Sequence, residues 1–166
     1  MCIRDSLTNT NLTNANLAQA NLTGANFTGT ILTGAILNNT SLAGVDLSGR
    51  DLTGANLTNT NLTGANLTGA ILTGATMTAA NLTGVDLSGR DFTGAVLYFS
   101  NFTGANLTGA ILTGTNLIAT NFVGANLSGA NLTGANPAGA QFTNATWSAT
   151  TCPDGTNSDT NPRCGN

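Results

Sequence analysis

Large apolar residues recur at every fifth position of this chain. The series begins at Leu7 and ends at Trp147, and Pro137 is its only member that is not a large apolar residue. The residue two places before each member is nearly always small, and the residue directly before it is usually Asn or Asp. Thr or Ser usually follows the apolar residue, and Gly usually comes next, so the consensus reads A-N-L-T-G.

A period of five residues fits neither a helix nor a simple strand. Five residues turn a helix by about 140°, which would scatter the apolar side chains around the cylinder. In a strand, an odd period moves the apolar residue to the other face at each repeat. Both difficulties vanish if each pentad is a short extended piece followed by a corner. Ala and Leu then point inward, Asn and Thr point outward, and Gly takes the corner, where a positive φ costs it little.

The corners that lack Gly indicate the number of sides. From Gly24 to Gly134 every corner holds Gly except at positions that recur every 20 residues, and Gln19 continues this series: Gln19, Asn39, Asn59, Ala79, Phe99 and Ala119. We therefore predict four pentads per coil. Because a bulky side chain resists positive φ, Phe99 further predicts a turn without positive φ at this corner. A longer repeat of two coils is also present, since VDLSGRD occurs at 45–51 and again at 85–91.

The A-N-L-T-G pattern resembles the pentapeptide-repeat family, and the resemblance covers residues 7–147. It implies an all-β fold, a right-handed quadrilateral β-helix of about seven coils of 20 residues. Each coil would rise by roughly 4.8 Å and would bond to its neighbours through the main chain. Columns of Leu and Ala would then fill a narrow core.

The two ends depart from the repeat. Residues 1–6, MCIRDS, look like the translated end of a transposon-type sequencing adapter, so we expect a non-native leader and a missing native N-terminus. Residues 148–166 are rich in turn-forming residues and contain Cys152 and Cys164. An open solenoid end needs a cap, and we expect this tail to form one that a disulfide between the two cysteines closes.

The tail is similar to those of secreted bacterial repeat proteins, and a disulfide would indicate an exported protein, extracellular or at the cell surface. Two free thiols on a frayed tail are the alternative. A calcium site formed by Asp154, Asn157 and Asp159 is a further interpretation, but their spacing does not match an EF-hand loop.

Composition narrows the chemistry. Only 7% of the residues are charged, and the chain has no His, Lys or Glu. Most ways to build a general acid–base pair or an activated nucleophile are therefore missing, and so are metal sites of the His/Cys kind. We predict no enzymatic activity, no cofactor and no metal.

A column of Thr is the most regular outward feature. It follows the apolar residues of one side of the coil without interruption: Thr13, Thr33, Thr53, Thr73, Thr93, Thr113 and Thr133. Such a ladder could bind ice or a polysaccharide. Thr is also a good exposed β residue that tandem duplication copies, and Asp51 and Asp91 interrupt the uncharged surface that ice binding would need.

Arg50 and Arg90 occupy inward positions that otherwise hold small residues. A buried guanidinium is costly unless it is paired, so we expect both side chains to turn outward over the corner. The expected result is two salt-bridged corners, formed by Arg50 with Asp46 and Asp51 and by Arg90 with Asp86 and Asp91.

Aromatic residues gather toward the C-terminal end. Phe102, Phe122 and Phe142 follow one another at intervals of one coil and are expected in the core. Tyr98 takes an outward position, and with Ile118 and Val123 it marks a small apolar contact surface.

These features predict a non-catalytic structural or protein-interaction module whose partner is an unknown protein or a second copy. A surface binder of ice or polysaccharide is the alternative. Some family members protect DNA gyrase by mimicking DNA, but four Asp and two Arg between Leu7 and Trp147 are too few charges to imitate a duplex. The chain has no basic patch for nucleic acid and no predicted membrane span.

Overall fold

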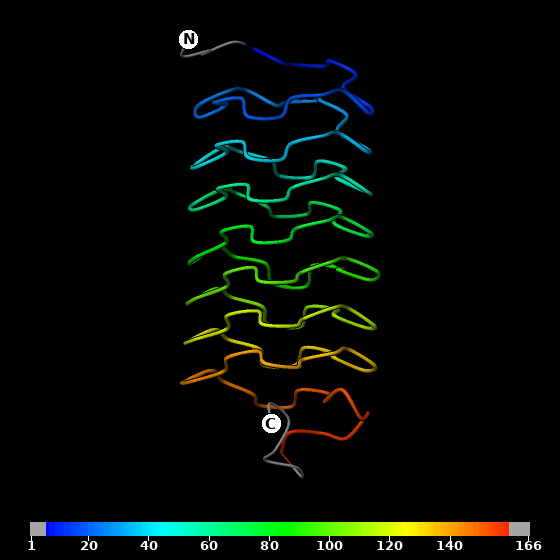
Figure 1. Cartoon of the computed structure of the whole chain (residues 1–166), viewed down its shortest axis with the longest axis vertical. Coiled ribbons are helices and arrows are strands. Elements are labelled where there is room, and N and C mark those ends of the chain that lie inside the picture. The colour runs from blue at the N-terminus through cyan, green and yellow to red at the C-terminus, as the bar shows by residue number, and fades with distance from the viewer. Residues whose placement is uncertain (1–5, 160–166) are drawn as a thin grey trace.

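In the computed structural model, which describes residues 6–159, the main chain winds into a stack of coils with the two termini at opposite ends (Figure 1). Within these residues there is no helix, and the β structure consists of isolated bridges. Parallel bridges pair residues 20 positions apart, from Ser6↔Asn26 near the N-terminus to Asn131↔Thr151 near the C-terminus. One coil therefore takes four pentads, as the sequence predicts.

Each coil has four walls, named here by the apolar residues at their centres. Wall A holds Leu7, Phe27, Leu47, Leu67, Leu87, Leu107, Leu127 and Trp147. Wall B holds Leu12, Leu32, Leu52, Leu72, Phe92, Leu112, Leu132 and Cys152. Wall C holds Leu17, Leu37, Leu57, Met77, Leu97, Leu117 and Pro137, and wall D holds Leu22, Leu42, Leu62, Leu82, Phe102, Phe122 and Phe142.

Every main-chain N–H of a typical pentad has a partner. The inward small residue donates to the preceding apolar residue across the turn, and the Asn or Asp donates to the coil before. The apolar residue and the corner residue donate to the coil after. The N–H of the residue directly after the apolar residue donates to the side chain of the Asn or Asp in the same pentad. The bonds in one pentad are Asn56 N to Ala35 O, Leu57 N to Thr76 O, Thr58 N to Asn56 Oδ1, Asn59 N to Thr78 O and Thr60 N to Leu57 O, all between 2.7 and 3.1 Å.

This scheme explains the preference for Asn and Asp before the apolar residue. A short side chain with an acceptor oxygen can reach the N–H two residues on, as in an Asx turn. Without it, the first N–H of the turn would have no partner in either neighbouring coil. The sequence shows that Asn or Asp recurs before the apolar residue, but that its side chain accepts a hydrogen bond becomes evident only in the folded coil.

All four corners share one backbone geometry. The prediction that the corner of Phe99 lacks a positive φ is wrong, because φ is +58° at Phe99, +54° at Ala79 and +67° at Gly84. The reason lies in the ladder between coils. Phe99 N donates to Ile118 O at 3.1 Å, just as Gly104 N donates to Val123 O at 2.9 Å, so neighbouring coils impose the same turn on any residue.

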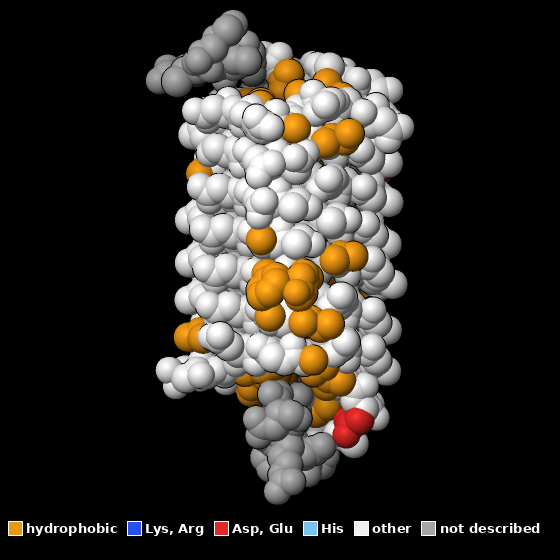
Figure 2. Space-filling view, in the orientation of Figure 1, with side chains coloured by type: hydrophobic (Ala, Val, Ile, Leu, Met, Phe, Trp, Pro, Cys, Tyr) orange, Lys and Arg blue, Asp and Glu red, His pale blue; other side chains and the backbone are white. Residues whose placement is uncertain are grey.

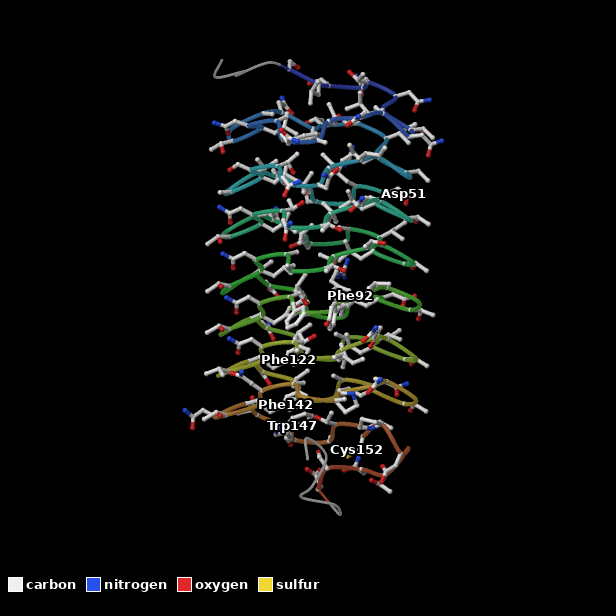
Figure 3. All side chains as sticks on the ribbon, viewed as in Figure 1. Asp51, Phe92, Phe122, Phe142, Trp147 and Cys152 are labelled. Atoms are coloured by element: carbon white, nitrogen blue, oxygen red, sulfur yellow. The ribbon has the colours of Figure 1, made fainter. Side chains whose placement is uncertain are left out.

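The apolar centres and the small inward residues form one continuous core. Four phenylalanines are completely buried, namely Phe27, Phe92, Phe102 and Phe122. On wall D the ring of Phe122 stacks on Phe102 with centroids 5.2 Å apart and on Phe142 with centroids 5.1 Å apart. Phe102 and Phe122 therefore belong to the core, as predicted, and Phe142, which Figure 3 labels with Phe122, is partly buried and packs against it.

Several inward positions hold buried Thr or Ser, and these hydroxyl groups find main-chain partners. Thr60 Oγ1 donates to Leu37 O in the preceding coil at 2.8 Å, and Thr120 Oγ1 donates to Leu97 O at the same distance. Among the described residues, every buried side-chain polar atom has a hydrogen-bond partner. These bonds join successive coils from inside.

Residues 148–159 cover part of the last coil. Thr151 pairs in antiparallel fashion with Asn157, and Cys152 N donates to Thr156 O at 2.7 Å. The N–H of Ala149 lies at a corner, where a carbonyl oxygen of a further coil would accept its hydrogen bond. It donates instead to Asp159 Oδ1 at 3.0 Å. The tail thus supplies acceptors where a next coil would have supplied them.

Two predictions about the ends concern residues that are not described. Cys152 is buried at the end of wall B (Figure 3), but Cys164 lies outside the described residues, so their disulfide stays a prediction. Residues 1–5 of the predicted leader also lie outside them. Ser6 is described, and it bridges Asn26.

Candidate functional site

The solenoid carries its charges at a single corner. Between Leu7 and Trp147, all charged residues lie on or beside the corner between walls A and B, which we call the charged corner: Asp46, Arg50 and Asp51, and two coils later Asp86, Arg90 and Asp91. The duplicated VDLSGRD segment therefore produces two equal groups on one edge of the molecule. Parallel strands lie about 4.8 Å apart, which puts the groups roughly 10 Å from each other.

The main chain holds both guanidinium groups. Arg50 Nε donates to Ser48 O at 3.1 Å and Nη1 donates to Phe27 O at 3.4 Å. Arg90 Nε donates to Ser88 O at 3.1 Å. Both side chains are half-buried, so they leave the core over the corner, but their hydrogen bonds run to carbonyl oxygens. The neighbouring carboxylates act on them at longer range.

Three aspartates of the charged corner are stabilised in their ionised form. The side-chain and backbone hydrogen bonds from Ser48 lower the pKa of Asp46, with smaller contributions from Asn66 and from the charge of Arg50. Hydrogen bonds from Thr53 likewise lower the pKa of Asp51, and those from Ser88 lower the pKa of Asp86. The corner therefore keeps its negative charge well into the acidic range.

A small cavity lies beside the first of the two groups. Its volume is about 200 Å³, and it is lined by Phe27, Thr28, Asp46, Ser48 and Arg50. Ligand pockets usually measure roughly 300–1,000 Å³ and are mostly apolar. The cavity is therefore small for a cofactor, and it presents one cation and one anion side by side.

The Thr column lies on the corner between walls B and C. Each Thr is the first residue of a turn, so the column Thr13, Thr33, Thr53, Thr73, Thr93, Thr113 and Thr133 runs along an edge of wall B. Some hydroxyl groups are already engaged within the chain. Thr33 Oγ1 donates to Asp51 Oδ2 at 3.0 Å, and Thr133 Oγ1 donates to Asn131 Oδ1 at 2.6 Å. On wall B itself, Ile31, Ile71 and Ile111 alternate from coil to coil with polar residues.

Two aromatic rings stand at the corner between walls C and D, which we call the aromatic corner. Phe99 is 55% exposed and Tyr98 is 36% exposed, and their ring centroids lie 4.1 Å apart. Ile118 and Val123, which were predicted to share this contact surface, are half-buried in the following coil. Figure 2 shows one face of the molecule, where a compact group of hydrophobic side chains stands out on a surface of uncharged polar residues.

Metal and membrane sites find no support in the described part of the chain. No group of three or more His, Cys, Asp or Glu side chains in residues 6–159 could hold a metal ion. No helix among those residues has the length and hydropathy to cross a membrane.

The sequence matches a known family model along almost its whole repeat region. The model of pentapeptide repeats matches in eight copies, over residues 6–39, 40–78, 51–89, 80–117 and 120–146. The chain belongs to the pentapeptide-repeat family. Members of this family form right-handed quadrilateral β-helices, and the match indicates no catalytic family. Among curated proteins, none matches this pentapeptide-repeat chain.

Solved structures of other pentapeptide-repeat proteins are similar to it. One is HetL from the cyanobacterium Nostoc sp. strain PCC 7120, a protein involved in regulating heterocyst differentiation. It is 28% identical, the match covers 92% of this chain and 87% of HetL, and the TM-score is 0.56. Another is QnrB1, a plasmid-mediated fluoroquinolone resistance protein, at 16% identity, with 87% and 80% coverage and a TM-score of 0.47.

Proposed function

We propose that this protein is a non-catalytic structural and protein-interaction module, a right-handed solenoid of about seven coils that presents different surfaces at its corners. The aromatic corner is the observation that carries this proposal. Exposed Tyr and Phe side chains are typical anchors of protein interfaces, and the other coils hold smaller residues at the corner position of Phe99. Pentapeptide-repeat proteins in general bind other proteins, which supports the same conclusion.

We further propose that the protein is exported and that Cys152 and Cys164 form a disulfide that holds the tail against the last coil. The buried position of Cys152 beneath Leu132 supports this, because a bond there would tie the tail to the solenoid end. A thiol titration of oxidised protein, with and without reductant, tests the bond. With the disulfide, Cys2 is the one cysteine that should react without reductant, and reaction of Cys152 and Cys164 as well would contradict the bond.

The alternative function is a surface binder of ice or polysaccharide through the Thr column. Its position along a corner and the engaged hydroxyl groups of Thr33 and Thr133 weaken this alternative. Thermal hysteresis and ice-recrystallisation assays test it directly. Mimicry of DNA has less support, because the acidic side chains of the solenoid lie in two groups that each contain an Arg.

The interaction module can be tested by photo-crosslinking in the cells that make the protein. Lysine-directed reagents are unsuitable because the chain has no Lys. A photo-reactive residue at Thr78, one coil before Tyr98, should give discrete protein adducts, whereas the same residue at Thr63 on the corner between walls D and A should give few. The proposal fails if neither position yields a protein adduct while the protein shows thermal hysteresis.

A further inference from the structure

Wall B carries alternating isoleucine and aspartate side chains on its outer face. The residue directly before each apolar centre, taken from one coil to the next, is Ile31, Asp51, Ile71, Asp91 and Ile111. We call this column the Ile/Asp stripe. Its isoleucines are 45%, 47% and 39% exposed, whereas both aspartates are half-buried. Apart from the aromatic corner, these isoleucines are the large exposed hydrophobic residues of the described chain, so wall B presents separate apolar groups with a carboxylate between them.

The carboxylates of the stripe keep their charge for a ligand. Arg50 and Arg90 directly precede them in the sequence, but both guanidinium groups are turned toward wall A. Arg50 Nε donates to Ser48 O on that wall, and Arg90 is held by the equivalent carbonyl oxygen. The charge of Arg50 contributes to the lowered pKa of Asp46 on wall A, but hydrogen bonds from neighbouring residues lower the pKa of Asp51 without a contribution from it. The outer face of wall B is therefore anionic at two points.

The spacing of the stripe selects the conformation of a periodic ligand. Like groups recur every two coils, or roughly every 9.6 Å. A polyproline II helix repeats after three residues of about 3.1 Å each, or about 9.3 Å. Two turns of an α-helix take about 10.8 Å, and side chains on one face of an extended strand recur about every 6.7 Å. Over the roughly 19 Å of the whole stripe, a polyproline II segment stays within about 1 Å of register, and the other two conformations do not.

The chemistry of the stripe indicates the sequence of such a segment. Laid along the solenoid axis, the segment places every third residue over an isoleucine, where proline or another apolar residue fits. A long basic side chain on an intervening residue then reaches the carboxylate that lies midway between two isoleucines. Polyproline II leaves its own carbonyl oxygens without internal hydrogen bonds, and hydroxyl groups of the adjacent Thr column, such as that of Thr93, can donate to them.

We infer that the Ile/Asp stripe binds a proline-rich basic peptide segment in the polyproline II conformation. Its isoleucines contact the apolar residues of the segment, and Asp51 and Asp91 pair with Lys or Arg. This surface goes beyond the interaction proposed at the aromatic corner and does not depend on it. The contacts are few and the ion pairs lie at the surface, so the peptide binds weakly, with a Kd on the order of 10⁻⁴ M.

Fluorescence anisotropy of a labelled peptide of three Pro-Pro-Lys repeats, titrated with the full chain up to about 1 mM, tests the inference. The wild type should bind this peptide and should not bind three Pro-Pro-Glu repeats. Three Gly-Ser-Lys repeats carry the same charge on a flexible chain and should bind about 5-fold more weakly or less. Absence of binding to the Pro-Pro-Lys peptide overturns the inference, and so does equal binding of the Gly-Ser-Lys peptide. A wild type that binds a chitosan oligomer but not the peptide would replace it by a cationic polysaccharide.

Charge variants locate the binding surface. Replacing both Asp51→Asn and Asp91→Asn should weaken binding of the Pro-Pro-Lys peptide by about 5-fold or more. Asn11 and Asn131 already occupy this column and accept the same turn N–H, so the double variant should fold, as far-UV circular dichroism would verify. The matched control replaces the two aspartates of wall A, Asp46→Asn with Asp86→Asn, and should change the Kd by less than about 2-fold. Equal weakening by the two pairs would show only long-range attraction and would overturn the inference.

An apolar variant tests the other half of the contact. Ile71→Asn should weaken binding by about 5-fold, because it removes the central isoleucine of the stripe and leaves the main chain as it is at Asn11. Ile36→Asn makes the same exchange at the equivalent position of wall C, where Asn56 also occurs, and should leave the Kd unchanged. A Kd that Ile71→Asn does not alter contradicts binding on the stripe.

Discussion

Replacing Phe122 by Leu is expected to destabilise the solenoid by about 2–3 kcal/mol, although Leu is the commonest residue at this position of the pentad. Phe122 is completely buried, and its ring lies nearly parallel to those of Phe102 and Phe142, at interplanar angles of 16° and 1°. Each such ring pair contributes roughly 0.5–1.5 kcal/mol beyond the buried area. The smaller side chain also leaves a void, which costs on the order of 1 kcal/mol.

Phe92→Leu is the matched control on wall B. Phe92 is equally buried, but the one ring contact found for it is with Phe102, edge-on at a centroid distance of 6.2 Å. The control removes the same atoms and a single weaker ring contact, so we expect a loss of roughly 1–2 kcal/mol.

Urea unfolding followed by far-UV circular dichroism and by the fluorescence of Trp147 measures both losses. The two signals also show whether the stack of coils unfolds in one step, which the free energies require. Equal losses for Phe122→Leu and Phe92→Leu would refute the argument from ring stacking. A double-mutant cycle with Phe142→Leu should give a coupling energy of about 0.5–1.5 kcal/mol.

Three further predictions concern the charged corner and the cap. The free energy of unfolding should stay nearly constant from about pH 5 to 9, because the chain has no His, and it should decrease below about pH 4. The aspartates with lowered pKa values stabilise the fold at pH values above their unfolded pKa. This stabilisation is lost as the pH falls through the folded pKa. Urea unfolding at a series of decreasing pH values measures the loss. Arg50→Thr should change the stability by less than about 1 kcal/mol in thermal unfolding, since Thr30 in the same column bonds the corresponding carbonyl of its preceding coil; a much larger loss would mean that the guanidinium supports the fold. Asp159→Ala should leave Ala149 N without its acceptor and speed hydrogen exchange at that amide, while exchange in the central coils stays unchanged.

The sequence predicts the repeat architecture well because the period is long-range and redundant. The Leu columns, the inward Ala residues and the 20-residue spacing of exceptions all require the same coil, so a single deviation such as Pro137 does not obscure it. The turn at Phe99 was predicted wrongly because the prediction relied on the resistance of a bulky residue to positive φ. In the folded chain, the hydrogen bonds of neighbouring coils set the corner geometry, and one unfavourable residue cannot change it.

The candidate surfaces were less predictable, because they depend on side-chain direction. The sequence places Arg50 and Arg90 near acidic residues, but it does not show that carbonyl oxygens of the main chain would accept their hydrogen bonds. It identifies Tyr98 as outward, whereas the exposure of Phe99 follows from a corner geometry that sequence reasoning had excluded. The sequence does offer one signal for this surface, because Phe99 occupies a corner position that holds smaller residues in the other coils.

Hydrogen–deuterium exchange of the full chain, alone and with a protein captured by crosslinking at Thr78, tests the central claim, that the aromatic corner is a surface through which this solenoid contacts protein. Amides of residues 96–100 and 116–120 should become more protected in the complex, and those of the charged corner and the Thr column should not. Protection at the charged corner or along the Thr column, with none at Tyr98 and Phe99, would contradict the account.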